Sequence, residues 1–498
     1  MFGSYVLGRA KAEYILARCL VFIFTYFGLL CGGYFIVAAT YGGIPCITHP
    51  VSIAIEVIAA VELLWFLFAY MPFRKLAQRN TTTDCTLLQP EPLNRAERAA
   101  FFAKCMSLVP DMEYFIRKWV QNAHLDDVRR DNVKDWLLWG LFDREGPPGE
   151  DDEELEQYIS QAEARLGYPI RKGRGECEAI RLSFDPVKMN HRSLFFYLII
   201  WCIDHFTAVF LYLMGFRHYR QKRSKFFRQF PPRPLALLAP KQAAAPGHLS
   251  FWARPHRSVT RRPVIFIHGV GVGLFPYMQF FRSIPRDVGI LAVEMMPIAG
   301  RLCEAMPSAN NIVASIAAAL DQLGPDFDDC VLVANSYGTF MTTPLLLSPA
   351  VSPKISSLVL ADPVAFLLHL PDVAYNFTRR RPRKYRGDEW QMHLNDCVVN
   401  APAVASYVEY DSAECTPADL ASLTSSEKWW TGSCPLELIW LPGEGHGAAL
   451  LSGRCIPVAT RVLDRYCVKT EAVPAPPDKE TQAGNERRDS TTSLDTTC

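Results

Sequence analysis

The sequence lacks several features that mark common classes of protein. Its 498 residues carry 52 Lys and Arg against 51 Asp and Glu, so no overall charge favours a nucleic-acid partner. Its 15 cysteines include no CxxC pair and no Cys/His spacing typical of a metal site. Several of them, including Cys19, Cys31 and Cys202, lie inside apolar runs. This indicates buried free thiols in a reducing compartment and argues against a disulfide framework.

Charge is also missing from residues 19–41, an apolar run long enough to cross a bilayer once. A second apolar run, residues 51–73, carries only Glu56 and Glu62, which are costly in lipid and should face another helix or the membrane boundary. The loop between the runs contains no Lys or Arg, whereas basic residues flank the pair on both sides. The positive-inside rule therefore predicts a two-helix membrane anchor over residues 19–73. The N-terminal segment 1–18 and the bulk of the chain would lie on the cytoplasmic face.

A third apolar run, residues 193–216, is flanked by basic residues on both sides and carries Asp204 and His205 at its centre. A simple crossing would strand the basic cluster that follows it on the wrong face. The sequence therefore favours a helix lying in the interface, or a re-entrant segment, over a third span, which stays the alternative. In the region 193–230, the basic and aromatic residues that follow the apolar run would then contact anionic lipid headgroups. We expect Asp204 and His205 to form a buried hydrogen-bonded pair.

The two regions between the apolar runs and the C-terminal half differ in composition. Residues 89–173 are polar with apolar residues at helical spacing, which predicts a small helical domain with Trp119, Trp136 and Trp139 in its core. Residues 231–260 are rich in Pro and Ala and are interpreted as a linker.

The C-terminal half alternates apolar strands with amphipathic helices. This pattern over residues 261–467 predicts a doubly wound α/β domain, with an insertion over residues 363–403 long enough for a lid. Residues 468–498 are polar and rich in Pro, Glu, Thr and Ser, which is typical of a disordered tail.

Ser336 stands at the end of an apolar strand, residues 331–334. A serine at a sharp strand-to-helix turn has its hydroxyl exposed at the end of a sheet, and the following helix N-terminus directs N–H groups at it. Such a turn demands small residues two places before and two places after the serine, and here these are Ala334 and Gly338. The pattern predicts that Ser336 is a nucleophile.

His268 and Gly269 begin a glycine-rich turn after a predicted strand, residues 264–267. Neither the lysine spacing of a phosphate-binding loop nor a true GxGxxG pattern fits, which argues against nucleotide binding. In acyl-transfer enzymes the same turn supplies one donor of the oxyanion hole, and the residue after the nucleophile supplies the other. The candidate donors are the N–H groups of Val270 and Tyr337.

The chain order Ser, then Asp or Glu, then His points to His446, in a Gly-rich loop after a predicted strand over residues 436–441. The acid must orient the imidazole and stabilise its charged form. Asp411, which follows a predicted strand, is preferred. Glu414 is its first rival, and Asp362, at the end of the strand after the nucleophile, is the second. No metal or cofactor is implied.

In order and spacing, His268-Gly269, Ser336, Asp362 and the late His446 resemble the α/β-hydrolase superfamily. The match covers residues 263–467, under half of the chain. Residues 362–377 are also similar to a poorly characterised branch whose members carry N-terminal membrane segments. The resemblance implies an α/β-hydrolase fold and hydrolase chemistry, and it implies no particular substrate.

These features predict a membrane-anchored esterase or lipase that cleaves a hydrophobic or lipid ester through Ser336, His446 and Asp411 and an acyl-enzyme. Two alternatives remain. Glu409 and Tyr410 stand where a glycine usually precedes the acid, so the chain could be an inactive membrane scaffold. An intact Ser336–His446 geometry would oppose that alternative. The second is acyl transfer to an acceptor other than water, which the same triad permits.

Overall fold

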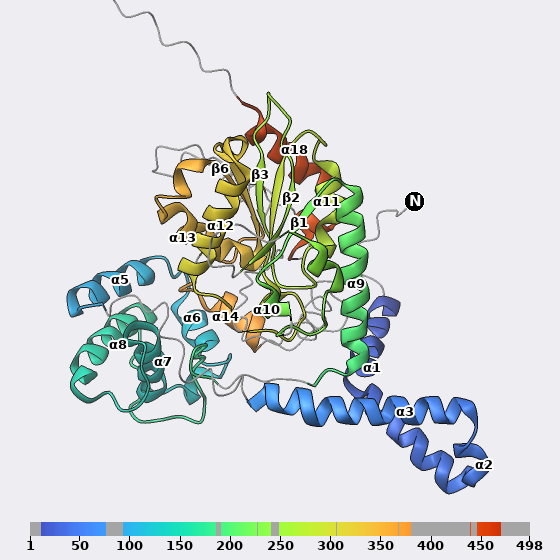
Figure 1. Ribbon diagram of the computed structural model, residues 1–498. Coiled ribbons are helices and arrows are strands. Elements are labelled where there is room, and N and C mark those ends of the chain that lie inside the picture. Colours follow the sequence, from blue (N-terminus) through green and yellow to red (C-terminus); the bar gives the residue numbers. More distant parts are fainter. Residues whose placement is uncertain are drawn as a thin grey trace, which may run out of the picture.

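The computed structural model describes residues 11–75, 93–185, 191–226, 228–240, 249–304, 306–366, 368–379, 439 and 446–469. Figure 1 shows three parts: long N-terminal helices, a separate group of helices, and a sheet flanked by helices. The fold class expected from the sequence is confirmed, since a mixed sheet follows apolar helices and a small helical unit.

A six-stranded mixed sheet lies at the centre of the α/β unit, in the order β1-β2-β4-β3-β5-β6. The strands β3, β4, β5 and β6 are parallel, and β2 runs antiparallel to both β4 and β1. Strands β3 to β5 are buried along their whole length, as expected of parallel strands covered on both faces. The bounds are β1 Arg217–Tyr219, β2 Ser250–Arg254, β3 Val264–Ile267, β4 Ile290–Glu294, β5 Cys330–Asn335 and β6 Ile355–Ala361.

Helices cover both faces of this sheet (Figure 1). Because successive side chains of a strand point to opposite faces, Val264 and Phe266 join one core, and Ile265 and Ile267 join the other. The first core includes residues of α9, α11 and α18, and the second includes residues of α12 and α13. The bounds are α9 Leu194–Leu213, α11 Met278–Ser283, α12 Ala309–Leu323, α13 Thr342–Leu347 and α18 Ile456–Cys467.

The sheet begins earlier than the sequence predicted. Strand β1 lies in the range assigned to a basic membrane flank, and β2 lies in the range assigned to a linker. Both carry arginine at an end, and β1 has three residues. Neither strand therefore shows the long apolar run that identified β3, β5 and β6. The α/β unit starts at Arg217, not at residue 261.

The helical unit has a hydrophobic core of its own. Trp119 is buried in it, and Trp136 and Trp139 pack against its edge, so the expected core position of these residues is confirmed. Side-chain caps fix two of the helix starts: Asn94 and Glu97 form a capping box, and Asp111 accepts from the Tyr114 N–H. The helices are α5 Arg95–Ser107, α6 Met112–Trp119, α7 Arg130–Phe142 and α8 Asp152–Leu166.

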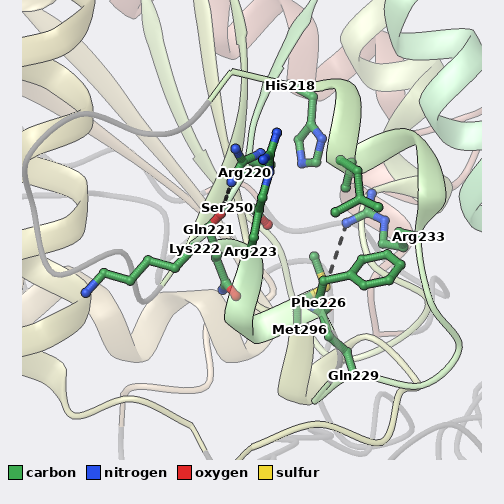
Figure 2. A pocket seen from close by; sticks show the side chains of 12 residues that line it. His218, Arg220, Gln221, Lys222, Arg223, Phe226, Gln229, Arg233, Ser250 and Met296 are labelled. Atoms are coloured by element: carbon green, nitrogen blue, oxygen red, sulfur yellow. Dashed lines mark hydrogen bonds between the residues drawn. The ribbon is translucent and has the colours of Figure 1, made fainter.

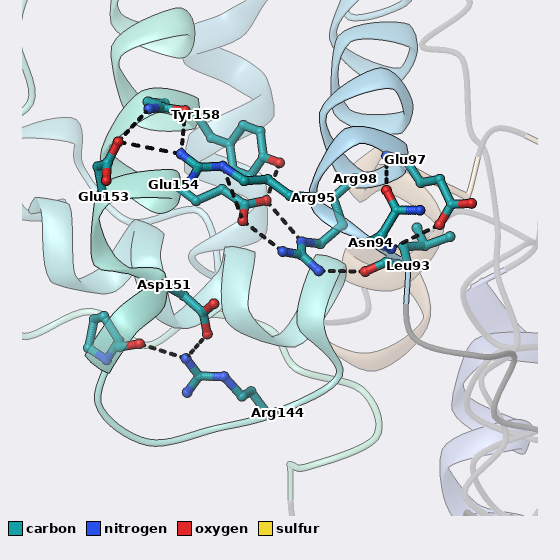
Figure 3. A network of polar contacts seen from close by, with 12 residues as sticks. Leu93, Asn94, Arg95, Glu97, Arg98, Arg144, Asp151, Glu153, Glu154 and Tyr158 are labelled. Carbon is teal, nitrogen blue, oxygen red and sulfur yellow. Dashed lines mark hydrogen bonds and ion pairs between the residues drawn. The ribbon is translucent and has the colours of Figure 1, made fainter.

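A buried carboxylate joins two of these helices (Figure 3). Glu154 of α8 accepts two hydrogen bonds from the Arg98 guanidinium of α5, at 2.7 and 2.9 Å, and a third from the Tyr158 hydroxyl at 2.6 Å. The bond from Arg98 is the main cause that lowers the pKa of Glu154. A bidentate pair of this kind fixes the position of α5 against α8.

The helical unit also holds a segment of the α/β unit. Helix α14 (Pro371–Thr378) packs against α6, and its Ala374 is buried in the helical unit's core. Tyr114 donates a hydrogen bond of 2.5 Å to Asp372, and the Lys118 ammonium lies 4.0 Å from the centre of the Tyr375 ring. The chain just beyond β6 is therefore bound to a separate core.

Three apolar helices are long enough to span a membrane: Arg18–Ile47, Pro50–Lys75 and Leu194–Leu213. The first contains most of α1 (Lys11–Val37), and the second begins with α3 (Pro50–Trp65). The third, α9, buries Ala208 and Leu211 against the α/β unit and leaves Val209 and Leu213 exposed. One side of α9 therefore belongs to the α/β unit, while the other is an exposed apolar surface.

The centre of α9 differs from the prediction of an Asp204–His205 pair. Asp204 forms an ion pair with Arg301, a buried residue in the loop after β4. His205 bonds through Nδ1 to the Trp201 carbonyl of its own helix, at 2.7 Å. Neighbouring residues on a helix point in different directions, so the two side chains meet different partners. The Asp204–Arg301 pair joins α9 to the α/β unit.

Glu62 lies where α1, α3 and α9 meet. Its carboxylate accepts hydrogen bonds from the N–H groups of Leu194 and Phe195, the first residues of α9, at 2.8 and 3.1 Å. On the α1 side, a Cβ atom at Gly28 would lie 2.9 Å from the Glu62 Cβ, so a side chain there would push Glu62 away. The expectation that Glu62 faces another helix is confirmed.

The cysteines within the described residues are all free thiols. Cys31 is buried, as expected from its apolar surroundings. Cys19 and Cys202 are exposed, so the expectation that they are buried is wrong. The reason is that apolar neighbours in the sequence of α1 and α9 form outer helix faces as well as inner ones.

We expect Glu62→Ala to destabilise the junction between α3 and α9. The variant leaves two N–H groups of α9 without their carboxylate, and a hydrogen bond to a charged group is worth about 1.5–3 kcal/mol. The measurement is the thermal unfolding midpoint of the detergent-solubilised chain. The matched control is Glu56→Ala on the same helix, because Oε1 of Glu56 is buried without a hydrogen-bond partner among the described residues. Equal losses of stability in the two variants would contradict the assigned role of Glu62.

Candidate active site

Ser336 occupies a strained turn at the carboxyl end of β5. Its φ of 49° lies in the left-handed region, which is unusual for a residue other than glycine. The chain then enters a 3₁₀ turn, Ser336–Met341, that leads into α13. A Cβ atom at Gly338 would lie 2.5 Å from the Ile267 carbonyl oxygen, so this position requires glycine. The strand–turn–helix geometry expected around Ser336 is present.

His446 is hydrogen-bonded to this serine. The distance from Ser336 Oγ to His446 Nε2 is 2.7 Å, although 110 positions separate the two residues. After His446, Gly447 has a φ of 84° and turns the chain into the short helix α17 (Ala448–Leu451). Burial lowers the pKa of His446, and the nearby Asp362 carboxylate acts in the opposite direction. A lowered pKa favours the neutral imidazole, which is the form that can accept a proton from serine.

Asp362 adjoins the histidine from the end of β6. It too has a left-handed backbone, with a φ of 48°. Burial raises the pKa of Asp362, whereas His446, the N–H groups of Gly447 and Ala449, and Asn335 act to lower it. The carboxylate therefore lies in electrostatic contact with His446 and with the start of α17. Two other candidate acids, Asp411 and Glu414, lie outside the described residues.

The glycine-rich turn after β3 lies directly against the nucleophile. A Cβ atom at Gly269 would be 2.8 Å from the Ser336 Cβ and 3.2 Å from the Asn335 carbonyl oxygen. This contact brings the peptide that carries the Val270 N–H close to Ser336. The side chains of Val270 and Tyr337 pack against the same core between the sheet and α12. The role of their N–H groups as oxyanion donors stays a prediction.

A chain of hydrogen bonds links the ends of β3, β5 and β6, and the sequence did not reveal it. The Tyr277 hydroxyl accepts from the Gly269 N–H at 3.1 Å and donates to Asn335 Oδ1 at 2.7 Å. Asn335 Nδ2 in turn donates to the Ala361 carbonyl at 3.3 Å. The one available signal was an amide side chain at Asn335, immediately before the nucleophile and at the end of an otherwise apolar strand.

His268 has a structural role. It is fully buried, and burial lowers the pKa of its imidazole. Its Nδ1 bonds to the Gly269 carbonyl at 2.7 Å, and its Nε2 accepts from the Met295 N–H at 3.0 Å. These two bonds connect the glycine-rich turn to the chain after β4. Among the described residues, no three His, Cys, Asp or Glu side chains are grouped to hold a metal ion.

The same turn also contacts the apolar helices. Val272 packs against a cluster that contains Leu20 and Phe24 of α1, Trp65 of α3 and Phe196 of α9. The turn next to Ser336 therefore joins the nucleophile to the helices that are long enough to span a membrane.

We expect Gly269→Ala to displace the turn from Ser336, because its methyl group has no room beside the nucleophile. Overpacking of this kind typically costs about 1–3 kcal/mol. Thermal unfolding should show that loss, and the Ser336 hydroxyl should react more slowly with an active-site probe. Gly271→Ala, in the same turn, is the control, since a Cβ atom there meets nothing within 4 Å. Identical behaviour of the two variants would show that the close approach at Gly269 has no consequence.

No protein-family model matches the chain, and no curated protein matches it. Similar solved structures include a lipase in its open form, at 19% identity over 24% of this chain and with a TM-score of 0.20. The chain spans about two fifths of that lipase's length, 40%.

Two further structures are matched over more of their length. One is a bacterial membrane phospholipase A, at 13% identity over 55% of this chain and 67% of that one, with a TM-score of 0.24. The other is Thermogutta terrifontis esterase 2 phosphonylated by sarin, at 15% identity over 44% of this chain and 88% of that one, with a TM-score of 0.26. These neighbours are α/β-hydrolases. The mixed six-stranded sheet of this chain, with helices on both faces, is an α/β fold.

Proposed function

We propose that the chain is a membrane-anchored serine hydrolase of the esterase or lipase type. The observation that carries this proposal is the 2.7 Å contact between Ser336 Oγ and His446 Nε2. A nucleophile and a base within hydrogen-bond reach, with the nucleophile on a strained turn, is the arrangement that covalent ester hydrolysis requires. The same contact opposes an inactive scaffold, which has no need to keep these two side chains together.

The proposed reaction follows from the two residues and the turns around them. His446 takes the proton from Ser336 as Oγ attacks the ester carbonyl carbon, and the N–H groups of Val270 and Tyr337 stabilise the oxyanion. The C–O bond to the alcohol then breaks, and His446 returns the proton to the leaving oxygen. Water, deprotonated by His446, attacks the acyl-enzyme and releases the acid and free Ser336.

Asp362 is the acid that the described contacts favour. Its carboxylate is near His446 and acts to raise the pKa of that imidazole, as expected of a group that stabilises the charged form. The order Ser336, Asp362, His446 along the chain is also the order of this class of triad. Asp411 and Glu414 remain the alternatives.

The contacts of the glycine-rich turn support a hydrophobic substrate. Val272 packs this turn against the cluster formed by side chains of α1, α3 and α9. Phe366, four residues after Asp362, is 55% exposed. Apolar side chains in the segments that carry the turn and the proposed acid suit an ester with a long acyl chain, such as a lipid. The distribution of basic residues around the first two apolar runs supports a cytoplasmic position for the catalytic unit.

The first test is labelling of the purified, detergent-solubilised chain with a fluorophosphonate probe, which reacts with activated serines. We expect the wild type to be labelled. Ser336→Ala removes the nucleophile, and His446→Ala removes its base, so both should abolish labelling. Thermal unfolding of each variant controls for loss of fold. A folded wild-type chain that takes no label would refute the hydrolase proposal and favour the scaffold.

The pH dependence of labelling tests the acid. The labelling rate should rise with pH as His446 loses its proton and becomes a base. Asp362 acts to raise the pKa of His446, so Asp362→Asn should move this rise to lower pH and reduce the maximal rate. Asp411→Asn and Glu414→Gln should leave the midpoint where it is. A shifted midpoint in one of those two variants, with none in Asp362→Asn, would transfer the role of the acid.

A further inference from the structure

A surface pocket lies near β1, at the edge of the sheet opposite to β6. This open pocket is lined by residues of β1, of the chain that follows it and of α10 (Arg223–Phe226), and by Met296. Its lining includes Arg220, Lys222, Arg223 and Arg233, and none of the residues at the proposed active site. We call this cavity the basic pocket. Figure 2 shows Arg220 and Arg223 on one side of it, and Arg233 and Phe226 on the other.

The positive charges around the basic pocket fall into two groups. Arg233 is neutralised, because its guanidinium donates to both oxygens of Glu294, at 2.9 and 3.0 Å. Glu294 also accepts from the Ser250 hydroxyl at 2.9 Å, and its pKa lies well below the usual range despite its burial. The carboxylate of Glu294 is therefore already paired with Arg233 and Ser250.

The second group has no such partner. Within the described part of the chain, no carboxylate lies within ion-pair distance of Arg220, Lys222 or Arg223. Arg220 does donate to the carbonyl oxygens of Ala239 and Gln221, which hold its side chain in place.

The next basic residues along the chain contrast with these three. Lys225 and Arg228 both have a carboxylate partner, because they share Glu304. Among the cations of residues 220–228, the three that have no carboxylate partner among the described residues therefore all line the basic pocket. Two guanidinium groups with free donors in a cavity suit an oxyanion, and phosphate most of all.

The basic pocket adjoins the membrane helices. Gln229 lines the pocket, and the next residue, Phe230, packs on Trp65 of α3 with ring centres 4.4 Å apart. Phe230 also contacts Tyr197 of α9, at 5.5 Å between ring centres. A phosphate bound in the pocket would thus lie beside Gln229, whose neighbour in the chain, Phe230, contacts side chains of the apolar helices.

We propose that the basic pocket binds the phosphomonoester group of an anionic membrane lipid, with Arg220 and Arg223 as its main ligands and Lys222 adding charge. The lipid would dock the α/β unit beside its anchor. This inference does not rest on the proposed hydrolase activity, because it uses no residue of that site. Free phosphate offers the same chemistry, and the position of the pocket next to α3 and α9 favours the lipid.

The test measures binding to the full, detergent-solubilised chain by isothermal titration calorimetry. The probes are a short-chain diether phosphatidate, the matching diether phosphatidylcholine, and inorganic phosphate. Ether links cannot be hydrolysed as esters, so the result is independent of catalysis. We expect phosphatidate to bind more tightly than either of the other two.

The variants assign that binding to the basic pocket. Lys222→Gln/Arg223→Gln removes two cations that have no carboxylate partner among the described residues, and we expect phosphatidate to bind about tenfold or more weakly. The control is Arg282→Gln/Arg286→Gln, which removes two exposed cations of the same unit, remote from the pocket. Unchanged thermal unfolding of both double variants ensures that the fold is intact.

Each outcome decides the proposal. Weaker phosphatidate binding in the pocket variant alone supports it. Equal weakening in both double variants, or in neither, would overturn it, because the binding would then reflect general charge or another site. Inorganic phosphate that binds as tightly as phosphatidate would assign the pocket to a soluble anion and overturn the lipid assignment.

Discussion

The close approach of the β5 turn to the β3 turn is the constraint on which the site depends. Gly338 must lie against the Ile267 carbonyl and Gly269 against Ser336, so neither position has room for a side chain. The Tyr277 hydroxyl bridges the two turns from within the core, bonded to Gly269 on one side and Asn335 on the other. Such a buried, satisfied network can hold Ser336 at a φ of 49° that the residue would not adopt alone.

The apolar helices are connected to this constraint by specific contacts and not by a flexible tether. Glu62 bonds to the first N–H groups of α9, Asp204 of α9 pairs with Arg301, and Val272 of the glycine-rich turn packs on the cluster that α1, α3 and α9 share. In each contact, a polar or aromatic side chain of a largely apolar helix packs against another part of the protein. The position of the nucleophile relative to the anchor is therefore built into the fold, which is why we favour a substrate that reaches the site from the membrane.

The sequence was most informative where one local pattern decides the structure. The strands β3, β5 and β6 are mostly apolar runs, followed by the His268-Gly269 turn, by Ser336 and by Asp362, and the backbone around Ser336 requires small neighbouring residues. The sequence was least informative where a side chain contacts a residue that is distant along the chain. Glu62 and Asp204 have similar apolar surroundings, but one caps a helix and the other pairs with an arginine 97 positions away. The strands β1 and β2 were missed because short strands with charged ends resemble loops. The sequence also does not show that Asp362 lies near His446, because that proximity arises only when the sheet forms.

The helical unit gains a role from the same geometry. Asp362 leaves β6 in a left-handed turn, and nine residues later the chain enters α14, which is held by Tyr114, Lys118 and the core of the helical unit. The segment between these two points is thus fixed at both ends, by the sheet on one side and by the helical unit on the other. A carboxylate that must face an imidazole needs a backbone that cannot swing away. The helical unit, though it supplies no residue to the proposed triad, restrains the part of the chain that carries the proposed acid.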